Sequence, residues 1–287
     1  MKPDTGSLPE SHTASQPFAG HASGQVVRVG GSAQLRVEPD ELAREVPVAL
    51  EYNGLSHATL LTTPCDLEDF AYGFSYTEGV IRAASDIYDL DIVERKNGLV
   101  IQLSIASACL NELKLRRRTL AGRTGCGLCG IESLDEVQRV LPALPERAGW
   151  LSSRAISDAV KNLRALQPLH LITGATHAAG WADGQGNIVS VREDVGRHNA
   201  LDKLIGHLLR QGIDTTAGFT VISSRASFEM VQKAAAAGIS AVIAVSAPTT
   251  YAIQMADELN LLLAGFARDD LFTLYTHPEF LSDGAVL

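Results

Sequence analysis

Two cysteines in a glycine-rich segment are the residues of this chain whose type and spacing most clearly indicate chemistry. Cys126 and Cys129 lie three residues apart in the sequence GRTGCGLCGIES, residues 122–133. A pair with this spacing could supply half of a zinc site, form a redox-active disulfide, or carry a nucleophilic thiolate on a loop. The surrounding glycines favour a loop that swings and approaches a partner closely.

A zinc site would need ligands that the neighbouring sequence does not supply. Structural zinc usually takes four Cys or His ligands, and no second CxxC or CxxxxH motif follows the pair. His177 and His198 could complete such a site only across the fold. A zinc deaminase would carry His-x-Glu before Pro-Cys-x-x-Cys, whereas no His-x-Glu precedes these cysteines and Gly125 stands in place of the proline. We therefore expect no bound metal, and a deaminase-type zinc hydrolase stays as a less favoured alternative.

The sequence around the cysteines favours a thiolate nucleophile over a redox disulfide. A thioredoxin-like pair opens a helix directly after a strand, but this pair follows the most basic stretch of the chain. Its arginines are Arg116, Arg117, Arg118 and Arg123. Such a run is often only a solvated surface, but guanidinium groups also lower a thiol pKa. Ser133 and Glu136 predict a capping box for a helix over 133–141, whose N-terminus would add to this effect. A thiolate attacks sulfur readily, so passing on a sulfane sulfur is natural chemistry here.

The composition indicates an acidic globular protein with one large domain or two smaller ones. The chain has 287 residues, 46% of them hydrophobic, and a formal net charge of −9. This charge argues against a dedicated nucleic-acid binder, because such proteins cluster Lys and Arg. No apolar run is long enough to span a membrane. Residues 1–24 lack the apolar core of a signal peptide and predict a disordered tail. We therefore expect a cytoplasmic protein, in which Cys65 and Cys109 are ordinary packed thiols.

The pattern of apolar residues divides the rest of the chain into three parts. Residues 25–115 predict an α+β domain, with a helix over 65–81 that Asp66 caps and Asp69 supports. Residues 116–151 form the Arg-rich CxxC loop and a linking helix. Residues 152–287 alternate apolar strands with amphipathic helices, which is typical of an α/β fold whose sheet contains parallel strands and is covered on both faces.

The expected elements follow from the same pattern. In the first part we expect strands over 25–30, 46–54, 57–63, 86–94 and 98–105. In the last part we expect strands over 169–182, 186–194, 218–224, 240–248, 261–267 and 271–277, and helices over 157–166, 197–212, 227–238 and 249–260.

Polar residues follow three of the predicted strands in the C-terminal part. Because ligands of open α/β sheets bind outside the carboxyl ends of the strands, these residues predict a binding site. Hydroxyl groups, helix N-termini and guanidinium groups at one edge would suit a phosphate or pyrophosphate. The alternative is that Ser227 and Thr249 only cap the helices that begin there. The candidates are Ser223, Ser224, Arg225, Ser246, Thr249 and Arg268.

A second polar group lies between the strand over 186–194 and the helix over 197–212. So many charges at one junction predict a functional corner, although a capped helix with pairs such as Asn199 with Lys203 would explain them as well. His177, at another strand end, is one more candidate. The corner consists of Arg192, Glu193, Asp194, Arg197, His198, Asn199, Asp202 and Lys203.

Seven sequence blocks in a fixed order make the chain resemble the FdhD family, the sulfurtransferases needed for active formate dehydrogenase. The resemblance extends from about residue 25 to the end of the chain. A single CxxC motif would be a weak signal, whereas this order of seven blocks is specific. The blocks are DLEDFAYGFSYTEGVI, TGCGLCGIESL, HAAGW, REDVGRHNALDKLIG, SSRASFEMVQKAA, AVSAPT and GFARDDLFTLYTHPE.

The resemblance implies a function, a cargo and partners. Family members take sulfur from a cysteine desulfurase as a persulfide on the cysteine that matches Cys126, and the cysteine that matches Cys129 assists or releases it. They pass the sulfur to the molybdenum of bis-molybdopterin guanine dinucleotide before this cofactor enters the catalytic subunit of formate dehydrogenase. Members form homodimers, and their C-terminal region resembles the cytidine-deaminase fold without its zinc ligands. The alternative is a non-catalytic chaperone that only holds the cofactor or the apo-dehydrogenase.

The cofactor segment of the family matches residues 266–271 of this chain. Its Arg268 agrees with the phosphate site expected at the strand ends. Its two aspartates depart from that expectation, because they place carboxylates beside an anionic ligand, and we expect them to accept N–H groups of guanine. We also expect the corner around Glu193, Asp194, Arg197 and His198 to shape the cofactor pocket. The matched segment consists of Phe266, Ala267, Arg268, Asp269, Asp270 and Leu271.

Overall fold

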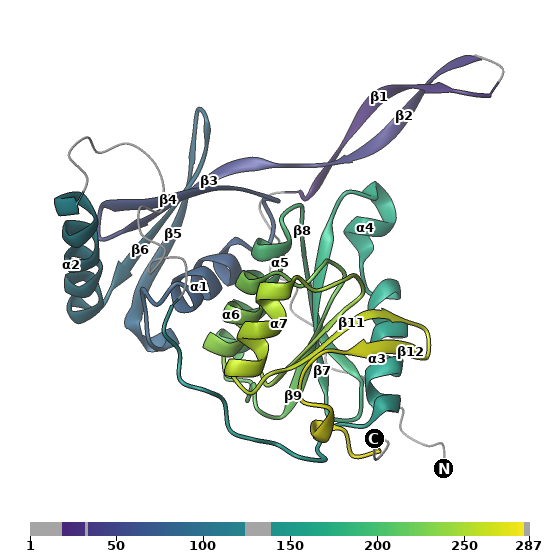
Figure 1. Cartoon of the computed structure of the whole chain (residues 1–287). Helices are drawn as coiled ribbons and strands as arrows, with labels where there is room; N and C mark the ends of the chain where they lie inside the picture. The colour runs from purple at the N-terminus through teal and green to yellow at the C-terminus, as the bar shows by residue number, and fades with distance from the viewer. Residues whose placement is uncertain (1–18, 32–33, 124–138, 284–287) are drawn as a thin grey trace, which may run out of the picture.

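The computed structural model describes residues 19–31, 34–123 and 139–283, without the side chains of 117–123. In this part of the chain the strands form a two-stranded ribbon, a four-stranded sheet and a six-stranded sheet. Figure 1 shows the ribbon extending away from the two larger sheets, which lie beside each other with helices between them.

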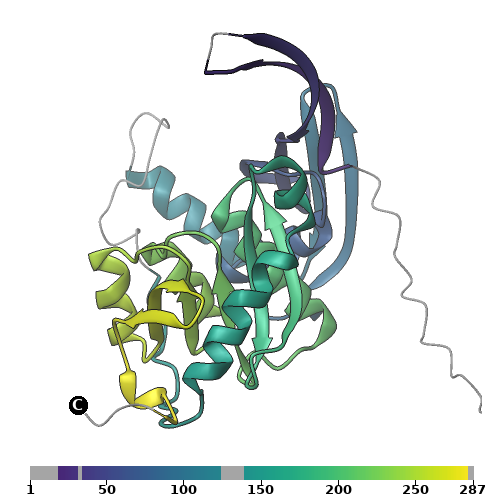
Figure 2. The ribbon, with the colours of Figure 1, turned by 90° about the vertical axis from the view of Figure 1, so that its right-hand side faces the viewer.

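The N-terminal ribbon corrects the prediction of a disordered tail over residues 1–24. His21 pairs with Ala43 at the base of the ribbon, so the end of the predicted tail is ordered. Pairing with a second strand supplies partners for the backbone groups, and composition alone does not reveal that partner. Residues 1–18 lie outside the described residues. The ribbon is an antiparallel pair that projects from the body in both views (Figures 1 and 2), made of β1 (His21–Val29) and β2 (Leu35–Ala43).

The four-stranded sheet has the order β4-β3-β6-β5, in which β3 and β6 are parallel and the other pairs are antiparallel. The helix that packs against it buries Phe70 and Phe74 as the sequence predicted, whereas Val80 joins the same core from the segment after the helix, which ends at Thr77. The elements of this unit are β3 (Val46–Tyr52), β4 (Leu55–Thr62), α1 (Leu67–Thr77), η1 (Ala84–Asp86), β5 (Ile87–Arg95) and β6 (Gly98–Ile105).

Helix α1 begins where the sequence predicted, but the predicted capping is wrong. Asp66 is the N-cap residue, yet its φ is 52° and its side chain accepts no capping hydrogen bond. Asp69 is buried and accepts hydrogen bonds from Arg192 (2.8 Å) and Arg210 (2.5 Å) instead. Two guanidinium groups from distant helix and strand residues form stronger, charge-assisted bonds than a backbone N–H would.

The basic run predicted as a loop is helical at its start. Helix α2 (Ser107–Arg123) contains residues 116–123, in agreement with the high helix propensity of Arg and Leu. Of the linking helix predicted over 133–141, residues 139–141 are not helical and residues 133–138 lie outside the described residues.

The six-stranded sheet has the order β12-β11-β10-β9-β7-β8. Strands β9, β10 and β11 are parallel, and the pairs made by β7, β8 and β12 are antiparallel. Helices α5, α6 and α7 pack on one face and α3 on the other, which confirms the predicted α/β class with both faces covered. Its strands are β7 (His177–Asp183), β8 (Ile188–Asp194), β9 (Gly218–Ile222), β10 (Ala241–Ala244), β11 (Leu262–Arg268) and β12 (Leu271–Leu274). Its helices are α3 (Ser153–Ala165), α4 (Pro168–Thr173), α5 (Arg197–Gln211), α6 (Phe228–Ala236), α7 (Thr250–Glu258) and η3 (Pro278–Phe280).

The strand predicted over 169–182 is wrong in its first half, where the chain forms helix α4. Pro168 occupies the first helical turn, and Gly174 ends the helix with a φ of 67°. Strand β7 then begins only at His177. The alternating apolar residues of the segment favoured a strand, but the proline and glycine that bracket it decide the outcome.

Helices α1 and α5 cross at two glycines. A Cβ atom on Gly73 would lie 1.7 Å from the backbone oxygen of Asp202, and one on Gly206 would lie 1.8 Å from the backbone oxygen of Asp69. Both distances are far inside van der Waals contact with backbone, which cannot move out of the way as a flexible side chain can. Glycine at both positions therefore lets α1, which packs on the smaller sheet, contact the backbone of α5, which packs on the larger one.

We predict that Gly73→Ala destabilises the protein by about 1–3 kcal/mol or more, because the added methyl group forces the two helices apart. Urea unfolding followed by circular dichroism measures the free energy of unfolding. Gly31→Ala is the control, since its Cβ meets no atom within 4 Å. Equal stabilities of the two variants would contradict the close helix crossing.

Candidate functional site

A cavity of about 930 Å³ opens at the carboxyl end of the parallel strands. This is the edge where the topology of an α/β sheet predicts a ligand, and the volume suits a nucleotide-sized molecule. The strand ends contribute Ser223, Ala267, Arg268 and Asp269 to its lining. Helices α3 and α4 contribute Lys161, Arg164 and His170, and β7 contributes His177.

The predicted site residues that follow β9 and β10 differ in the hydrogen bonds and the solvent exposure of their side chains. Ser223 lines the cavity, and its hydroxyl accepts the N–H of Ala178 at 2.8 Å. Ser224 is buried and donates to the backbone oxygen of Arg225 at 3.0 Å. The side chains of Arg225 and Ser246 are exposed at the same edge. Ser223 and Ser224, which follow β9, thus form hydrogen bonds within the protein, whereas Arg225 and Ser246 are exposed to solvent.

The alternative that Ser227 and Thr249 serve only as helix caps holds for one of them. Thr249 caps α7 by accepting the N–H of Ala252 at 3.2 Å. Ser227 occupies the N-cap of α6 but makes no capping bond, and its hydroxyl lies 3.4 Å from Nε2 of His198.

Residues 266–271 carry the chain from β11 into β12, and residues 267–269 of this segment line the cavity. Phe266 and Asp269 have φ values of 52° and 53°, a left-handed conformation that costs energy in residues other than glycine. Phe266 is 57% exposed and Leu271 is 78% exposed. The carboxylate of Asp270 pairs with Lys161 at 2.5 Å. One of the two aspartates expected beside an anionic ligand is therefore already neutralised by a cation.

In the predicted corner after β8, the two acids Asp194 and Asp202 are buried and form ion pairs within the protein. Asp194 is fully buried, pairs with Lys203 at 2.6 Å, and accepts hydrogen bonds from the hydroxyl of Thr62 and the N–H of Thr63. Its carboxylate thus joins the corner to the end of β4. Asp202 pairs in the same way with Lys233 at 3.0 Å. These acids hold the two sheets together.

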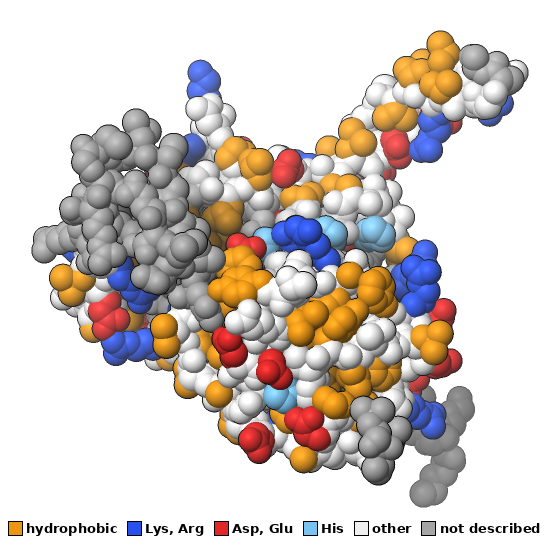
Figure 3. Space-filling model, viewed as in Figure 1, with side chains coloured by type: hydrophobic (Ala, Val, Ile, Leu, Met, Phe, Trp, Pro, Cys, Tyr) orange, Lys and Arg blue, Asp and Glu red, His pale blue; other side chains and the backbone are white. Residues whose placement is uncertain are grey.

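His177 lines the cavity, whereas Arg197 and His198, which were expected to shape the cofactor pocket, are half-buried residues outside its lining. The Nε atom of Arg197 is buried and has no hydrogen-bond partner in the described part of the chain. His198 contacts Glu229 at 2.7 Å, and burial lowers the pKa of this histidine. Burial, and then the neighbouring Arg197, lower the pKa of His177. On the face of the molecule that is seen in Figure 1, Lys, Arg and His side chains gather near the centre, next to a hydrophobic patch (Figure 3).

Sequence reasoning missed the wall of the cavity that α3 and α4 provide. Lys161 and Arg164 occupy the exposed side of α3, whose other side packs into the core. In the sequence they resemble the solvent side of any amphipathic helix. Only the position of α3 beside the strand ends makes them part of a binding site.

Cys126 and Cys129 lie outside the described residues, so their position relative to the cavity stays a prediction. The described residues on either side of them contact the C-terminal end of α1. Arg116 donates to the carbonyl oxygens of Glu78 (3.2 Å) and Gly79 (2.5 Å), and Arg139 donates to that of Thr77. Guanidinium groups are favourable partners for the free carbonyls of a helix end.

The described ranges contain neither a metal-binding cluster of side chains nor an apolar helix of membrane-spanning length. No group of three or more His, Cys, Asp or Glu side chains there is placed to hold a metal ion. None of the helices in these ranges has the length and hydropathy of a membrane span.

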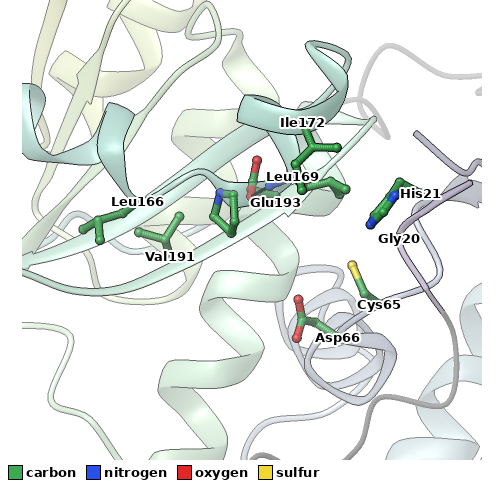
Figure 4. Close-up of a pocket in the computed structure, with 10 residues that line it drawn as sticks. Gly20, His21, Cys65, Asp66, Leu166, Leu169, Ile172, Val191 and Glu193 are labelled. Carbon is green, nitrogen blue, oxygen red and sulfur yellow. Dashed lines mark hydrogen bonds between the residues drawn. The ribbon is translucent and has the colours of Figure 1, made fainter. Parts of the chain in front are cut away.

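A second cavity of about 420 Å³ contains the thiol of Cys65 (Figure 4). It lies between the base of the ribbon at His21, the start of α1 and helix α4. Burial raises the pKa of Cys65 to about 11, although Lys203 at 3.9 Å opposes the shift. Burial also raises the pKa of Cys109. Both thiols are therefore protonated at neutral pH and are poor nucleophiles.

We predict that iodoacetamide modifies Cys65 slowly at pH 7, and faster as the pH rises towards 11, because only the thiolate reacts. Peptide mapping by mass spectrometry over about pH 7 to 10 measures the rate. The unfolded chain in urea is the control, where the same cysteine titrates near the ordinary pKa of about 8.5. Fast modification of the folded protein at pH 7 would contradict the buried thiol.

Comparison with known proteins agrees with the resemblance of the seven sequence blocks. The model of the FdhD/NarQ family matches residues 43–282. A sulfur carrier protein FdhD from Bordetella petrii is 54% identical over 261 residues, which are 91% of this chain and 94% of that protein. A protein of the same name from Cupriavidus necator is 52% identical over 254 residues, 88% of each chain.

The fold also matches a crystal structure from Desulfotalea psychrophila of a protein described as a formate dehydrogenase accessory protein. The TM-score is 0.69 at 21% sequence identity, and the match covers 91% of this chain and 99% of that one. This chain belongs to the FdhD/NarQ family.

Proposed function

We propose that this chain is a sulfurtransferase in the maturation of formate dehydrogenase, with Cys126 as the residue that carries the sulfur. The observation that carries the proposal is the 54% identity, over nine-tenths of the chain, to a protein named sulfur carrier protein FdhD. The CxxC pair supplies the chemistry, because a thiolate both accepts and passes on a sulfane sulfur. The thiols of Cys65 and Cys109 do not compete for this role, since burial raises the pKa of each.

The loading step needs no external oxidant. The Cys126 thiolate attacks the outer sulfur of a persulfide on a cysteine desulfurase. A new S–S bond forms at Cys126 as the S–S bond of the donor breaks, and the donor cysteine leaves as a thiolate. The proton of the donor persulfide stays on the transferred sulfur, so the product is a Cys126 persulfide.

The second cysteine gives a route for release. The Cys129 thiolate attacks the inner sulfur of the Cys126 persulfide, which forms a Cys126–Cys129 disulfide and expels hydrosulfide. The hydrosulfide is the form in which molybdenum receives the sulfur as a ligand. A cellular dithiol then reduces the disulfide, which returns the pair to its starting state.

The proposed cargo is molybdenum in bis-molybdopterin guanine dinucleotide, bound as a substrate at the carboxyl edge of the larger sheet. The cavity of about 930 Å³ supports this proposal through its volume and through the cationic side chains of Lys161, Arg164 and Arg268. Residues 267–269 of the segment matched to the family's cofactor site line the same cavity. Pyrophosphate groups bind guanidinium and ammonium groups strongly, and an acidic protein offers few such places.

The function implies partners and a location. A cysteine desulfurase supplies the sulfur, and the catalytic subunit of formate dehydrogenase receives the sulfurated cofactor. We further propose that the protein acts as a homodimer in the cytoplasm, where cysteine thiols stay reduced.

The test is mass spectrometry of the intact protein after incubation with a cysteine desulfurase and cysteine. We expect an adduct of one sulfur atom, about 32 Da, on a peptide that contains Cys126. Cys126→Ala should abolish the adduct, and Cys65→Ala, as the control, should retain it. An adduct confined to Cys65 or Cys109 would refute the assignment.

The same variants separate a sulfurtransferase from a chaperone that only holds the cofactor or the apo-dehydrogenase. In cells that lack this protein, Cys126→Ala should fail to restore formate dehydrogenase activity, while Cys65→Ala should restore it. Full activity with Cys126→Ala would favour the chaperone.

A further inference from the structure

We propose that His207 of helix α5 is a pH switch between the four-stranded and six-stranded sheets. When its ring takes up a second proton, it releases Arg192 of strand β8 and loosens helix α1, which Arg192 holds through Asp69. The inference does not depend on the proposed function, because it concerns only how the two sheets are joined. His207 lies outside the lining of the cavity of about 930 Å³.

The position of the proton on the neutral ring of His207 is the first argument. Nη2 of Arg192 lies 2.7 Å from Nδ1 of His207. A guanidinium group has N–H donors and no acceptor, so Nδ1 accepts this bond and the single proton of the neutral ring lies on Nε2. Protonation of Nδ1 would set two donors and two positive charges against each other. The contact therefore requires the neutral ring.

The other hydrogen bonds of Arg192 are the second argument. Its Nε donates to Asp69 of α1 at 2.8 Å, and its Nη1 donates to the backbone oxygen of Val191 at 2.8 Å. The carboxylate of Asp69 is 5% exposed, and its second oxygen accepts from Arg210 at 2.5 Å. Arg192 thus joins β8 to α1 and contacts α5 through His207. A protonated ring that displaces Arg192 therefore disturbs the contacts of all three elements.

The charges around His207 are the third argument, because they decide the direction of the effect. Arg192 of β8 and Arg210 of α5 oppose protonation, whereas Asp66 and Asp69 of α1 favour it. Nδ1 lies 3.7 Å from Asp69, but both oxygens of this carboxylate are already bonded to guanidinium groups. The side chain of His207 is 21% exposed. Burial, and then Arg192, lower the pKa of His207 below its ordinary value of 6.5.

A pKa that is lower in the folded protein than in the unfolded chain makes stability depend on pH. Above a pH of about 6.5 the ring of His207 is neutral in both states, so the contact with Arg192 contributes fully. As the pH falls below this value, the unfolded chain binds the proton first. The free energy of unfolding then decreases until the pH has passed the pKa of the folded protein. The contact is therefore present at neutral pH and lost in acid.

The place of His207 in the fold decides what acid loosens. His207 directly follows Gly206, one of the two glycines at which α5 crosses α1. Arg192 directly precedes Glu193, whose carboxylate fixes α4. We therefore expect protonation of His207 to weaken the packing of α1 on α5.

Urea unfolding of the full chain at about pH 7.5 and about pH 5.5 tests the switch, with His207→Asn as the variant. Asparagine can place an oxygen acceptor near the position of Nδ1, has a helix propensity close to that of histidine, and does not titrate. Between the two pH values, the equilibrium constant for unfolding should rise about 3- to 10-fold more in the unaltered protein than in the variant. This difference corresponds to the loss of one hydrogen bond. Equal rises in the two proteins would refute the switch.

His277→Asn is the matched control, because Nδ1 of His277 pairs with a carboxylate, that of Glu279 at 2.9 Å, and not with an arginine. It should retain the acid sensitivity of the unaltered protein.

Two measurements on the unaltered protein need no variant. NMR titration of the histidine rings should give His207 a pKa below the ordinary value. Amide hydrogen exchange, corrected for its intrinsic pH dependence, should be about 3- to 10-fold less protected in α1 at about pH 5.5 than at about pH 7.5. A pKa of His207 at or above the ordinary value, or equal protection of α1 at both pH values, would overturn the proposal.

Discussion

The buried ion pair between Asp194 and Lys203 is the interaction on which the candidate site depends. Both side chains are fully buried and their charged atoms lie 2.6 Å apart. Removing two charges from water is costly unless further hydrogen bonds satisfy them. Here Lys203 also donates to the backbone oxygens of Thr63 (2.9 Å) and Glu193 (3.2 Å), and Asp194 accepts from Thr62 and Thr63. The pair thereby joins the end of β4 to the junction of β8 and α5, beside the carboxyl edge of the larger sheet.

Two consecutive acids at the end of β8 show how this junction organises its surroundings. Successive side chains of a strand point to opposite faces. Asp194 therefore binds Lys203 and the end of β4, while Glu193 fixes helix α4 on the other side. A second buried pair, between Asp202 and Lys233, repeats the linkage where α5 meets α6 and α1. Because the glycine crossing of α1 and α5 lies beside these pairs, the two sheets behave as one framework for the cavity.

The chemistry of the protein is divided between this framework and the cysteine segment. The framework supplies a cationic cavity with the volume of a nucleotide site, lined by strand ends on one side and by α3 and α4 on the other. The thiols inside the framework are held in the protonated state by burial. In the proposed function, the framework binds the cargo, and the segment with Cys126 and Cys129 carries the sulfur.

The amino-acid sequence by itself determined the α/β class, most of the strands and helices, the family and the edge of the sheet where a cavity occurs. These features follow from local patterns: apolar periodicity, glycines and prolines at element ends, and short motifs in a fixed order. Tertiary structure alone decided that Asp69 binds two arginines rather than a helix end, and that Asp194 is buried against Lys203. It alone also placed Lys161 and Arg164 beside the strand ends. The physical reason is that charged side chains find partners far away in sequence, and no local pattern encodes which partner the packing of two sheets brings within reach.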